Sequence, residues 1–274
     1  MEPWCLALLI AGGAALALLG AWLFLIAPRP RRAQDMKPFL VPYAHRGLWG
    51  GEIPENSLAA FARAAEEGFG IELDVQLSAD GEVVVFHDYT LKRMCGRDVK
   101  LATLTAAELG ESRLGDSDQC IPTLKQVLEV VGGRVPLLIE MKGESTNAAL
   151  VEPMLQVLRG YEGEWCVESF NPMLLSVLKK RAPHVVRGLL VTDLIKDKKK
   201  GSKLLNFALS AMLLNVICRP AFVAWNRQYP FALSRAAAFA MGARSMVYTV
   251  RDENEYRAHL KKGTYPIFEG FLPK

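Results

Sequence analysis

Polar side chains interrupt three short apolar runs of this sequence, at places where acid–base chemistry and cation binding would be possible. They are His45 and Arg46 after residues 40–44, Glu72 and Asp74 within "IELDV", and Glu140 and Lys142 within "IEMK". Residues two positions apart in a strand point to the same side of a sheet, so each alternating pair should present its side chains together. These six residues are therefore candidates for a reactive site.

The three carboxylates among them point to a bound cation. In a closed interior Glu72, Asp74 and Glu140 would repel one another unless a positive charge lay between them. Carboxylate oxygens are hard ligands, and no cysteine lies beside them in the sequence, so Mg²⁺ or Ca²⁺ is expected before Zn²⁺. The alternative is a metal-free network in which Arg46 and Lys142 neutralise the carboxylates.

Two of the four histidines end apolar runs beside these carboxylates. They are His45 and His87, whereas His184 and His259 lie in sequence typical of the protein surface. Two histidines on either side of one phosphate can act as general base and general acid, and each role contributes about 10²- to 10⁴-fold.

The two cations near the carboxylates complete this set. A guanidinium matches phosphate oxygens with paired hydrogen bonds, and an ammonium adds a point charge, so Arg46 and Lys142 are expected to hold a phosphate. A cation site, two histidines, an arginine and a lysine together describe a phosphodiester site.

The elements that must position these side chains alternate between strand-like and helical patterns from residue 38 onward. Eight strands are predicted, at 40–45, 70–75, 135–141, 165–169, 186–191, 221–225, 245–250 and 265–269. Helices are predicted at 57–67, 123–131, 147–159, 172–181, 231–240 and 253–261. This pattern predicts a closed TIM-type (β/α)8 barrel, in which the carboxyl ends of the strands meet at one face.

One further strand, at 82–87, follows the 70–75 strand too closely for a parallel crossover. The Asp80-Gly81 pair predicts a hairpin turn between the two strands. A hairpin folded symmetrically about that turn places Asp74 roughly opposite His87. The alternative is an edge hairpin with an incidental histidine.

The start of the chain has a different character, because residues 4–26 carry no charge. The run exceeds the roughly 20 residues that span a bilayer as helix, and Trp4 and Trp22 lie near its ends. A cleaved signal peptide is the alternative, although no basic residue precedes the run. Four basic residues follow it: Arg29, Arg31, Arg32 and Lys37. They predict a single-pass protein of the cell membrane with its catalytic domain in the cytoplasm.

The 274 residues therefore divide into an anchor (1–28), a basic linker (29–39) and one barrel domain (40–274). Within the barrel, residues 192–220 are the least regular, and we expect an insertion or capping helix there. Membrane contact near the lysines of this segment is a second hypothesis for it.

The composition is globular, with 51% hydrophobic and 23% charged residues. The net charge of +4 owes much to the basic linker and the lysines near residue 200, so it favours an anionic membrane surface over nucleic acid as a partner. The five cysteines form no CxxC pair, which suits reduced thiols in a cytosolic domain.

Taken in order, several short motifs resemble those of the glycerophosphodiester phosphodiesterases. They are "HRG" at 45–47, "PENS" at 54–57, "ELDV" at 72–75, "DGEVVVFHD" at 80–88, "IEMK" at 139–142 and "SFN" at 169–171. The resemblance extends from residue 41 to about residue 272. It implies a TIM-type barrel and metal-dependent hydrolysis of a glycerophosphodiester to sn-glycerol 3-phosphate and an alcohol.

The matched positions also imply roles for individual residues. His45 and His87 would be the catalytic acid and base, Glu72, Asp74 and Glu140 the metal ligands, and Arg46 and Lys142 the phosphate-binding residues. Asn56 would bind substrate at the site mouth, Glu55 would be a further candidate metal ligand, and Phe170 would line the glycerol or leaving-group side.

The chain departs from the family pattern near its C-terminal end. The family often has Trp-Thr-Val-Asn where this sequence has "YTVR" at 248–251, and "FEGFLP" at 268–273 replaces a Thr-Asp-Tyr-Pro-like motif. These positions shape the leaving-group pocket, so the resemblance leaves the substrate open. The alternatives are a lysophospholipase D-like hydrolase of membrane glycerophospholipids and a non-catalytic membrane protein that binds glycerophosphate groups.

Overall fold

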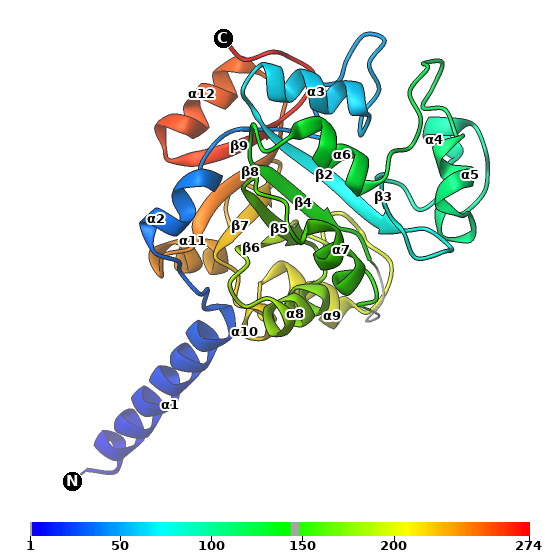
Figure 1. The fold of residues 1–274 in the computed structure, drawn as a ribbon. Helices are drawn as coiled ribbons and strands as arrows, with labels where there is room; N and C mark the ends of the chain where they lie inside the picture. Colours follow the sequence, from blue (N-terminus) through cyan, green and yellow to red (C-terminus); the bar gives the residue numbers. More distant parts are fainter. Residues whose placement is uncertain (1, 144–147) are drawn as a thin grey trace.

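The computed structural model describes residues 2–143 and 148–274, and a ring of parallel strands forms its centre (Figure 1). The strands of the ring are β1 (Tyr43–Ala44), β2 (Gly70–Leu77), β4 (Leu137–Met141), β5 (Trp165–Ser169), β6 (Arg187–Val191), β7 (Phe222–Asn226), β8 (Arg244–Val250) and β9 (Thr264–Phe268). The ring closes because β1 pairs with both β2 and β9. The eight predicted strands and the TIM-type barrel are therefore confirmed.

Six helices surround this ring at the predicted places. They are α3 (Leu58–Glu66), α6 (Leu124–Val131), α7 (Val151–Leu158), α8 (Pro172–Arg181), α11 (Leu233–Ala240) and α12 (Glu253–Lys261). Side chains fix where helices begin: the Ser57 hydroxyl accepts from the Ala60 N–H, and Thr123 and Gln126 form a capping box at α6. The predicted start of the third helix, at residue 147, lies outside the described residues.

The strands carry apolar side chains on both faces, because one face lines the barrel and the other packs under the helices. Leu138, Phe222 and Met246 belong to the inner cluster, whereas Ile139 and Val223 belong to the outer one. This two-sided burial explains why the strands read as nearly continuous hydrophobic runs.

Inside the barrel, the Phe222 ring fills the space beside Gly188, where a β-carbon would overlap the ring. We expect Gly188→Ala to lower the free energy of unfolding by about 1–3 kcal/mol, because the packed ring has no room to move away. Urea denaturation measures this change. Gly110→Ala is the control, since no heavy atom lies within 4 Å of a β-carbon there. Equal stability of Gly188→Ala and the parent would contradict this account of the packing.

The predicted hairpin is present, with β3 (Val83–Val85) antiparallel to β2. Val75 pairs with Val85, and the Phe86 N–H donates to the Asp74 carbonyl at 2.9 Å. Asp74 therefore lies opposite Phe86, one residue from the predicted partner His87. The antiparallel register is set by the turn, and Gly81 adopts the positive φ of 85° that this turn requires.

A small lobe follows the hairpin and lies beside the barrel in Figure 1. It contains α4 (Lys92–Cys95), η2 (Leu101–Thr103) and α5 (Ala106–Gly110), none of which the sequence analysis predicted. Leu91, Leu101 and Leu109 are fully buried in a separate small core that includes Phe86 of the hairpin. The core of the lobe thus fixes Phe86 at the end of the hairpin, directly before His87.

The helix α1 (Pro3–Ile26) projects away from the barrel (Figure 1) and is long and apolar enough to cross a membrane. Its last turn is fixed to α10 (Asn215–Cys218): the Asn215 side chain donates to the Ile26 carbonyl at 2.9 Å, and Arg219 donates to the Phe24 carbonyl at 2.8 Å. The linker after it contains α2 (Ala33–Met36) and η1 (Lys37–Phe39).

Residues 192–220, which we predicted to form an insertion or capping helix, contain α9 (Lys203–Ser210) and α10. The helix α9 leaves Leu204 and Phe207 exposed, while α10 contacts the end of α1. All five cysteines are free thiols, and Cys166 and Cys218 are buried.

Candidate active site

The carboxyl ends of the strands enclose a cavity of about 180 Å³ that collects most of the predicted site residues. His45, Arg46, Glu72, His87, Glu140 and Phe170 line it. Each of the remaining predicted residues, Asp74, Lys142, Asn56 and Glu55, contacts Arg46 or Glu140 of this set. The barrel thus brings together side chains from distant parts of the chain.

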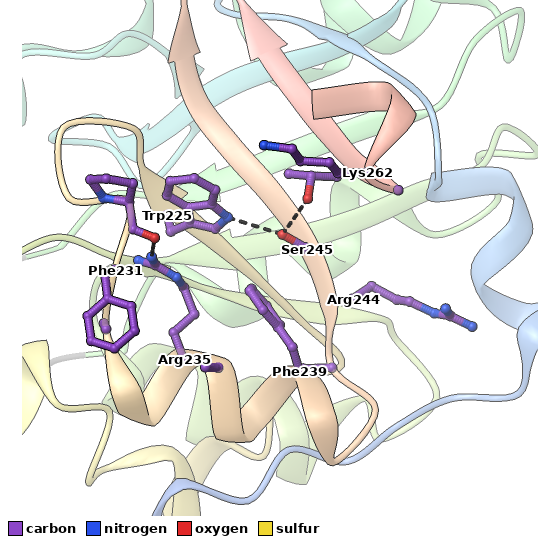
Figure 2. Close-up of a pocket in the computed structure, with 13 residues that line it drawn as sticks. Trp225, Phe231, Arg235, Phe239, Arg244, Ser245 and Lys262 are labelled. Carbon is purple, nitrogen blue, oxygen red and sulfur yellow. Dashed lines mark hydrogen bonds between the residues drawn. The ribbon is translucent and has the colours of Figure 1, made fainter. Parts of the chain in front are cut away.

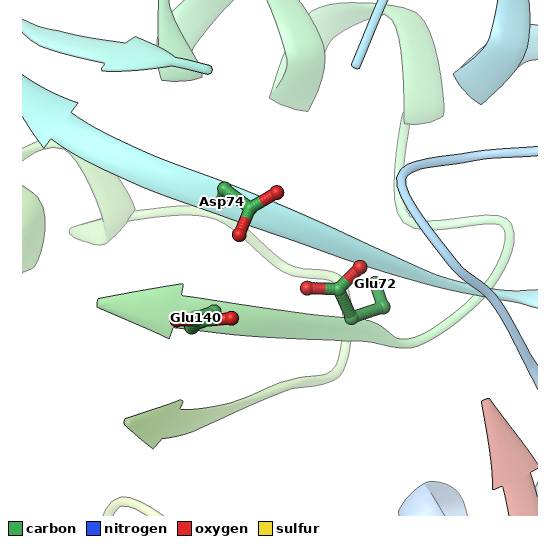
Figure 3. A group of neighbouring side chains, drawn as sticks. All are labelled: Glu72, Asp74 and Glu140. Atoms are coloured by element: carbon green, nitrogen blue, oxygen red, sulfur yellow. The ribbon is translucent and has the colours of Figure 1, made fainter. Parts of the chain in front are cut away.

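Three buried carboxylates lie close together at the cavity (Figure 3), and two of them, Glu72 and Glu140, line it. Glu72 and Asp74 come from β2 and Glu140 from β4, where Asp74 and Glu140 are register partners. One oxygen from each lies within 4.8 Å of the others. This confirms the expected convergence of the trio.

The electrostatics of the trio indicate a shortage of positive charge. Burial, together with repulsion from Asp74 and Glu140, raises the pKa of Glu72 well above its usual value. Burial likewise raises the pKa of Glu140 to about 7. For Asp74, burial is outweighed by Lys142 and Arg46, which lower its pKa. The negative charges of Glu72 and Glu140 are therefore not fully balanced by neighbouring cations. Three such oxygen donors fit a hard divalent cation.

The turn that presents Arg46 is tightly constrained. Arg46 has a φ of 59° and Gly47 a φ of 81°, and a β-carbon on Gly47 would lie 2.8 Å from the Ala60 β-carbon of α3. The glycine is required because backbone and helix approach so closely. The turn also directs the Arg46 N–H toward the Glu72 carboxylate, at 2.9 Å.

The side chains of Arg46 and Lys142 lie against the carboxylates. Arg46 donates to Glu55 at 2.8 Å, and its Nε lies 3.4 Å from Asp74 without a hydrogen bond. Lys142 Nζ lies 3.0 Å from Glu140 and 3.4 Å from Asp74. Burial alone would lower the pKa of Lys142, but Asp74 and Glu140 raise it, so the ammonium stays charged.

Both predicted catalytic histidines line the cavity, and each is oriented by a carboxylate. His45 Nδ1 is hydrogen-bonded to Glu269, and its Nε2 lies 3.9 Å from Glu72. His87 Nδ1 bonds to Asp88 at 2.7 Å. Burial lowers the pKa of His87 more than Asp74 raises it, so its neutral form is favoured. Each ring thus has one nitrogen fixed and the other available.

Asn56 and Glu55 contact other side chains of the site in the structure. Asn56 is fully buried and donates to Asp74 at 2.9 Å, so it orients that carboxylate. Glu55 pairs with Arg46 and with Arg93, the latter at 2.6 Å, and within the described chain it does not belong to the trio. Both residues are thus in contact with charged side chains of the site.

Phe170 forms an apolar wall of the cavity together with Tyr248. The two rings pack edge to face with centroids 5.9 Å apart, and Phe170 keeps 41% of its surface exposed. The Tyr248 hydroxyl donates to the Val191 carbonyl at 3.0 Å. This wall is the part of the cavity suited to an apolar group.

Sequence reasoning missed two acidic residues of the site. Glu168 on β5 is the register partner of Glu140, and its buried Oε2 has no hydrogen-bond partner within the described chain. Glu269 follows β9 and holds His45. Each interrupts or ends an apolar strand, "WCVES" and "TYPIFE", and this signal could have identified both.

Comparisons with known proteins agree with this geometry. The family model described as the glycerophosphoryl diester phosphodiesterase family matches residues 45–269. A glycerophosphodiester phosphodiesterase of Caldanaerobacter subterraneus is 38% identical over 161 residues, which cover 54% of this chain and 65% of the relative. Glycerophosphodiester phosphodiesterase 1 of Homo sapiens is 30% identical over 65% of this chain and 57% of its own length. The match thus spans less than two thirds of both relatives.

Solved structures share the fold over most of the chain. A phosphodiesterase of Oleispira antarctica, solved in complex with its product sn-glycerol-3-phosphate, superposes with a TM-score of 0.69 and 26% identity, over 84% of this chain and 92% of that one. A glycerophosphodiester phosphodiesterase of Thermotoga maritima gives a TM-score of 0.63 and 28% identity, over 84% and 94%.

Proposed function

The chain belongs to the glycerophosphoryl diester phosphodiesterase family, and from this we propose that it hydrolyses a glycerophosphodiester to sn-glycerol 3-phosphate and an alcohol. The observation that carries the proposal is that His45 and His87 line the same cavity as two carboxylates, Glu72 and Glu140, of a buried trio. The test is release of sn-glycerol 3-phosphate from glycerophosphocholine and glycerophosphoethanolamine by the purified full chain.

Glu72, Asp74 and Glu140 would hold a divalent cation, Mg²⁺ or Ca²⁺, because they offer three buried hard oxygen ligands. Such a cation, when bound, polarises a phosphoryl oxygen and offsets the negative charge that develops in the transition state. Asn56 keeps Asp74 oriented toward the trio through its hydrogen bond.

Side chains of this protein would bind the phosphate and carry out the two proton transfers. Arg46 and Lys142 lie at the carboxylates with donors that can reach phosphate oxygens. His87, which burial keeps neutral, accepts a proton from the nucleophile as its oxygen bonds to phosphorus. The nucleophile is water, or it is the neighbouring glycerol hydroxyl, in which case water then opens the cyclic phosphate. His45, held through Nδ1 by Glu269, then donates a proton from Nε2 to the leaving alkoxide.

Glu269 is expected to position His45. Its hydrogen bonds to His45 and Arg251 outweigh burial and lower its pKa to about 2, so it is ionised at any ordinary assay pH. Glu269→Gln keeps the shape but removes the charge, and we expect kcat to fall about ten- to a hundredfold with KM little changed. Steady-state kinetics measure both constants.

Arg251→Gln is the matched control for this prediction, because Arg251 contacts the other Glu269 oxygen and is exposed. It should leave kcat within about threefold of the parent, since an exposed ion pair is worth about 1 kcal/mol or less. An unchanged kcat in Glu269→Gln would show that His45 does not depend on this carboxylate.

We also propose that α1 anchors the protein in the cell membrane, with the barrel in the cytoplasm. The support is the apolar Trp4–Ile26 segment and the basic residues that follow it. A signal peptide would satisfy the same length and composition. Resistance to carbonate extraction would support an anchor, and protease protection of the barrel in intact cells would support the cytoplasmic orientation.

A lysophospholipase D-like activity is the second candidate. The Phe170 and Tyr248 wall favours it, because an acyl chain could lie along exposed aromatic surface at the cavity. Parallel assays of the detergent-solubilised chain on lysophospholipid and on glycerophosphocholine, each with Mg²⁺ and with Ca²⁺, separate the two activities. Binding without turnover of either substrate would instead support the non-catalytic alternative.

A further inference from the structure

A second cavity, of about 350 Å³, lies outside the barrel between α11 and the strands β7 and β8 (Figure 2). Its lining combines aromatic and basic side chains, among them Trp225, Phe231, Arg235, Phe239 and Lys262, with the hydroxyl of Ser245. We call it the α11 slot. None of the described residues that line it is acidic.

The main feature of the α11 slot is a buried arginine. Arg235 is only 5% exposed, and its guanidinium carbon lies 4.3 Å from the centre of the Trp225 ring. It donates to the carbonyls of Tyr229 and Pro230, at 3.0 and 2.5 Å. No carboxylate of the described chain lies within ion-pair distance of it, and burial lowers its pKa to about 10. A buried cation without a counter-charge is costly, so an anionic ligand would stabilise it.

Other groups in the slot are also donors. Lys262 is exposed and has no ion-pair partner among residues 2–143 and 148–274. The Ser245 hydroxyl oxygen accepts from Trp225 Nε1 at 3.1 Å and bonds to the Thr264 hydroxyl at 3.1 Å. With Thr264 as the donor, the Ser245 proton is available to a ligand. A group with several acceptor oxygens and negative charge, such as a phosphate, matches these donors.

The slot lies beside the end of α1. The helix α1 packs against α11, which forms one wall of the slot, and a β-carbon on Gly242 would lie 3.0 Å from Pro30 of the linker. At the slot, Phe231 is 80% exposed, and the neighbouring Leu233 is 65% exposed. Exposed apolar side chains next to a basic pocket are typical of contact with lipid.

We propose that the α11 slot binds a phosphate group, with Arg235 and Lys262 as its cationic donors and the headgroup of an anionic phospholipid as its source. Phosphate binding is inferred from the residues of the slot alone. That the phosphate belongs to a lipid depends on the proposed membrane anchor. In Figure 2 the Arg244 side chain extends away from the other side chains, so we do not include it among the donors.

Hydrogen exchange of α11 in the detergent-solubilised full chain tests this proposal. The probes are dihexanoyl phosphatidic acid, inorganic phosphate and dihexanoyl phosphatidylcholine, with EDTA present to prevent metal-dependent turnover. Phosphatidic acid should slow exchange in residues 233–240, while zwitterionic phosphatidylcholine at the same concentration should not. Arg235→Gln should weaken the effect about tenfold or more, and Lys262→Gln about fivefold.

Lys261→Gln is the matched control, because Lys261 is an exposed neighbour that does not line the slot. Protection by phosphatidic acid alone supports a phospholipid as the source of the phosphate. Equal protection by inorganic phosphate would overturn the lipid source and indicate that the slot binds a soluble phosphate. No protection by either, or protection that both variants retain, overturns the proposal. If Arg235→Gln does not fold, the test is whether phosphatidic acid protects α11 less in Lys262→Gln than in Lys261→Gln. The readout lies on α11, so it does not depend on whether the catalytic proposal holds.

Discussion

Alanine in place of His45 or His87 is expected to lower kcat by about 10²- to 10⁴-fold in each single variant. His45 keeps 17% and His87 32% of its side chain exposed in the cavity, so neither contributes much to the core. Folding should therefore be intact while proton transfer is lost. Turnover of glycerophosphocholine, measured with circular dichroism and thermal unfolding of the same samples, checks both parts of this expectation.

His184→Ala is the control, because His184 is exposed on the loop before β6 and should leave kcat unchanged. Activity near the parent level in a folded His45→Ala or His87→Ala variant would remove that histidine from the mechanism. If an alanine variant loses activity because it unfolds, a Gln variant at the same position distinguishes the two effects. Glutamine keeps a polar side chain but lacks the imidazole.

Glu140→Gln is expected to abolish cation binding and to lower activity more than about a hundredfold. The change removes one charge from the trio with almost no change of volume, and an amide is a much weaker ligand for a hard cation than a carboxylate. Isothermal titration with Mg²⁺ and Ca²⁺ measures binding independently of activity. EDTA should abolish the activity of the parent, and added cation should restore it.

Glu129→Gln is the matched control, since Glu129 is exposed on α6 and does not belong to the trio. Full activity of the parent in EDTA would contradict a metal site. It would favour the alternative in which Lys142 and Arg46 alone neutralise the carboxylates, for which contacts of 3.0 to 3.4 Å already exist.

Much of this protein could be predicted from its sequence because the relevant signals are local. Apolar runs separated by helical segments predicted the eight strands of the barrel, and alternation along one strand placed Glu72 and Asp74 on one side. The carboxyl ends of parallel strands meet in any such barrel, so the convergence with Glu140 followed without knowledge of individual contacts.

The hairpin shows where local signals lose accuracy. The Asp80-Gly81 pair predicted the turn, but the side chain opposite Asp74 depends on how many residues the turn consumes. The difference of one residue put Phe86 opposite Asp74. The short helices of the adjoining lobe were missed because they have only three to five residues, too few for helical periodicity.

The sequence by itself determined the barrel, the reactive residue types and their order along the chain. Only the tertiary structure decided which groups meet: Glu269 holds His45 across 224 positions because closure of the barrel brings β9 beside β1. The pairing of β4 with β5 likewise sets Glu168 beside Glu140, and packing of α11 on the wall buries Arg235 over Trp225. The physical reason is that periodicity records which face of an element is buried, whereas partners are chosen by the register and packing between elements.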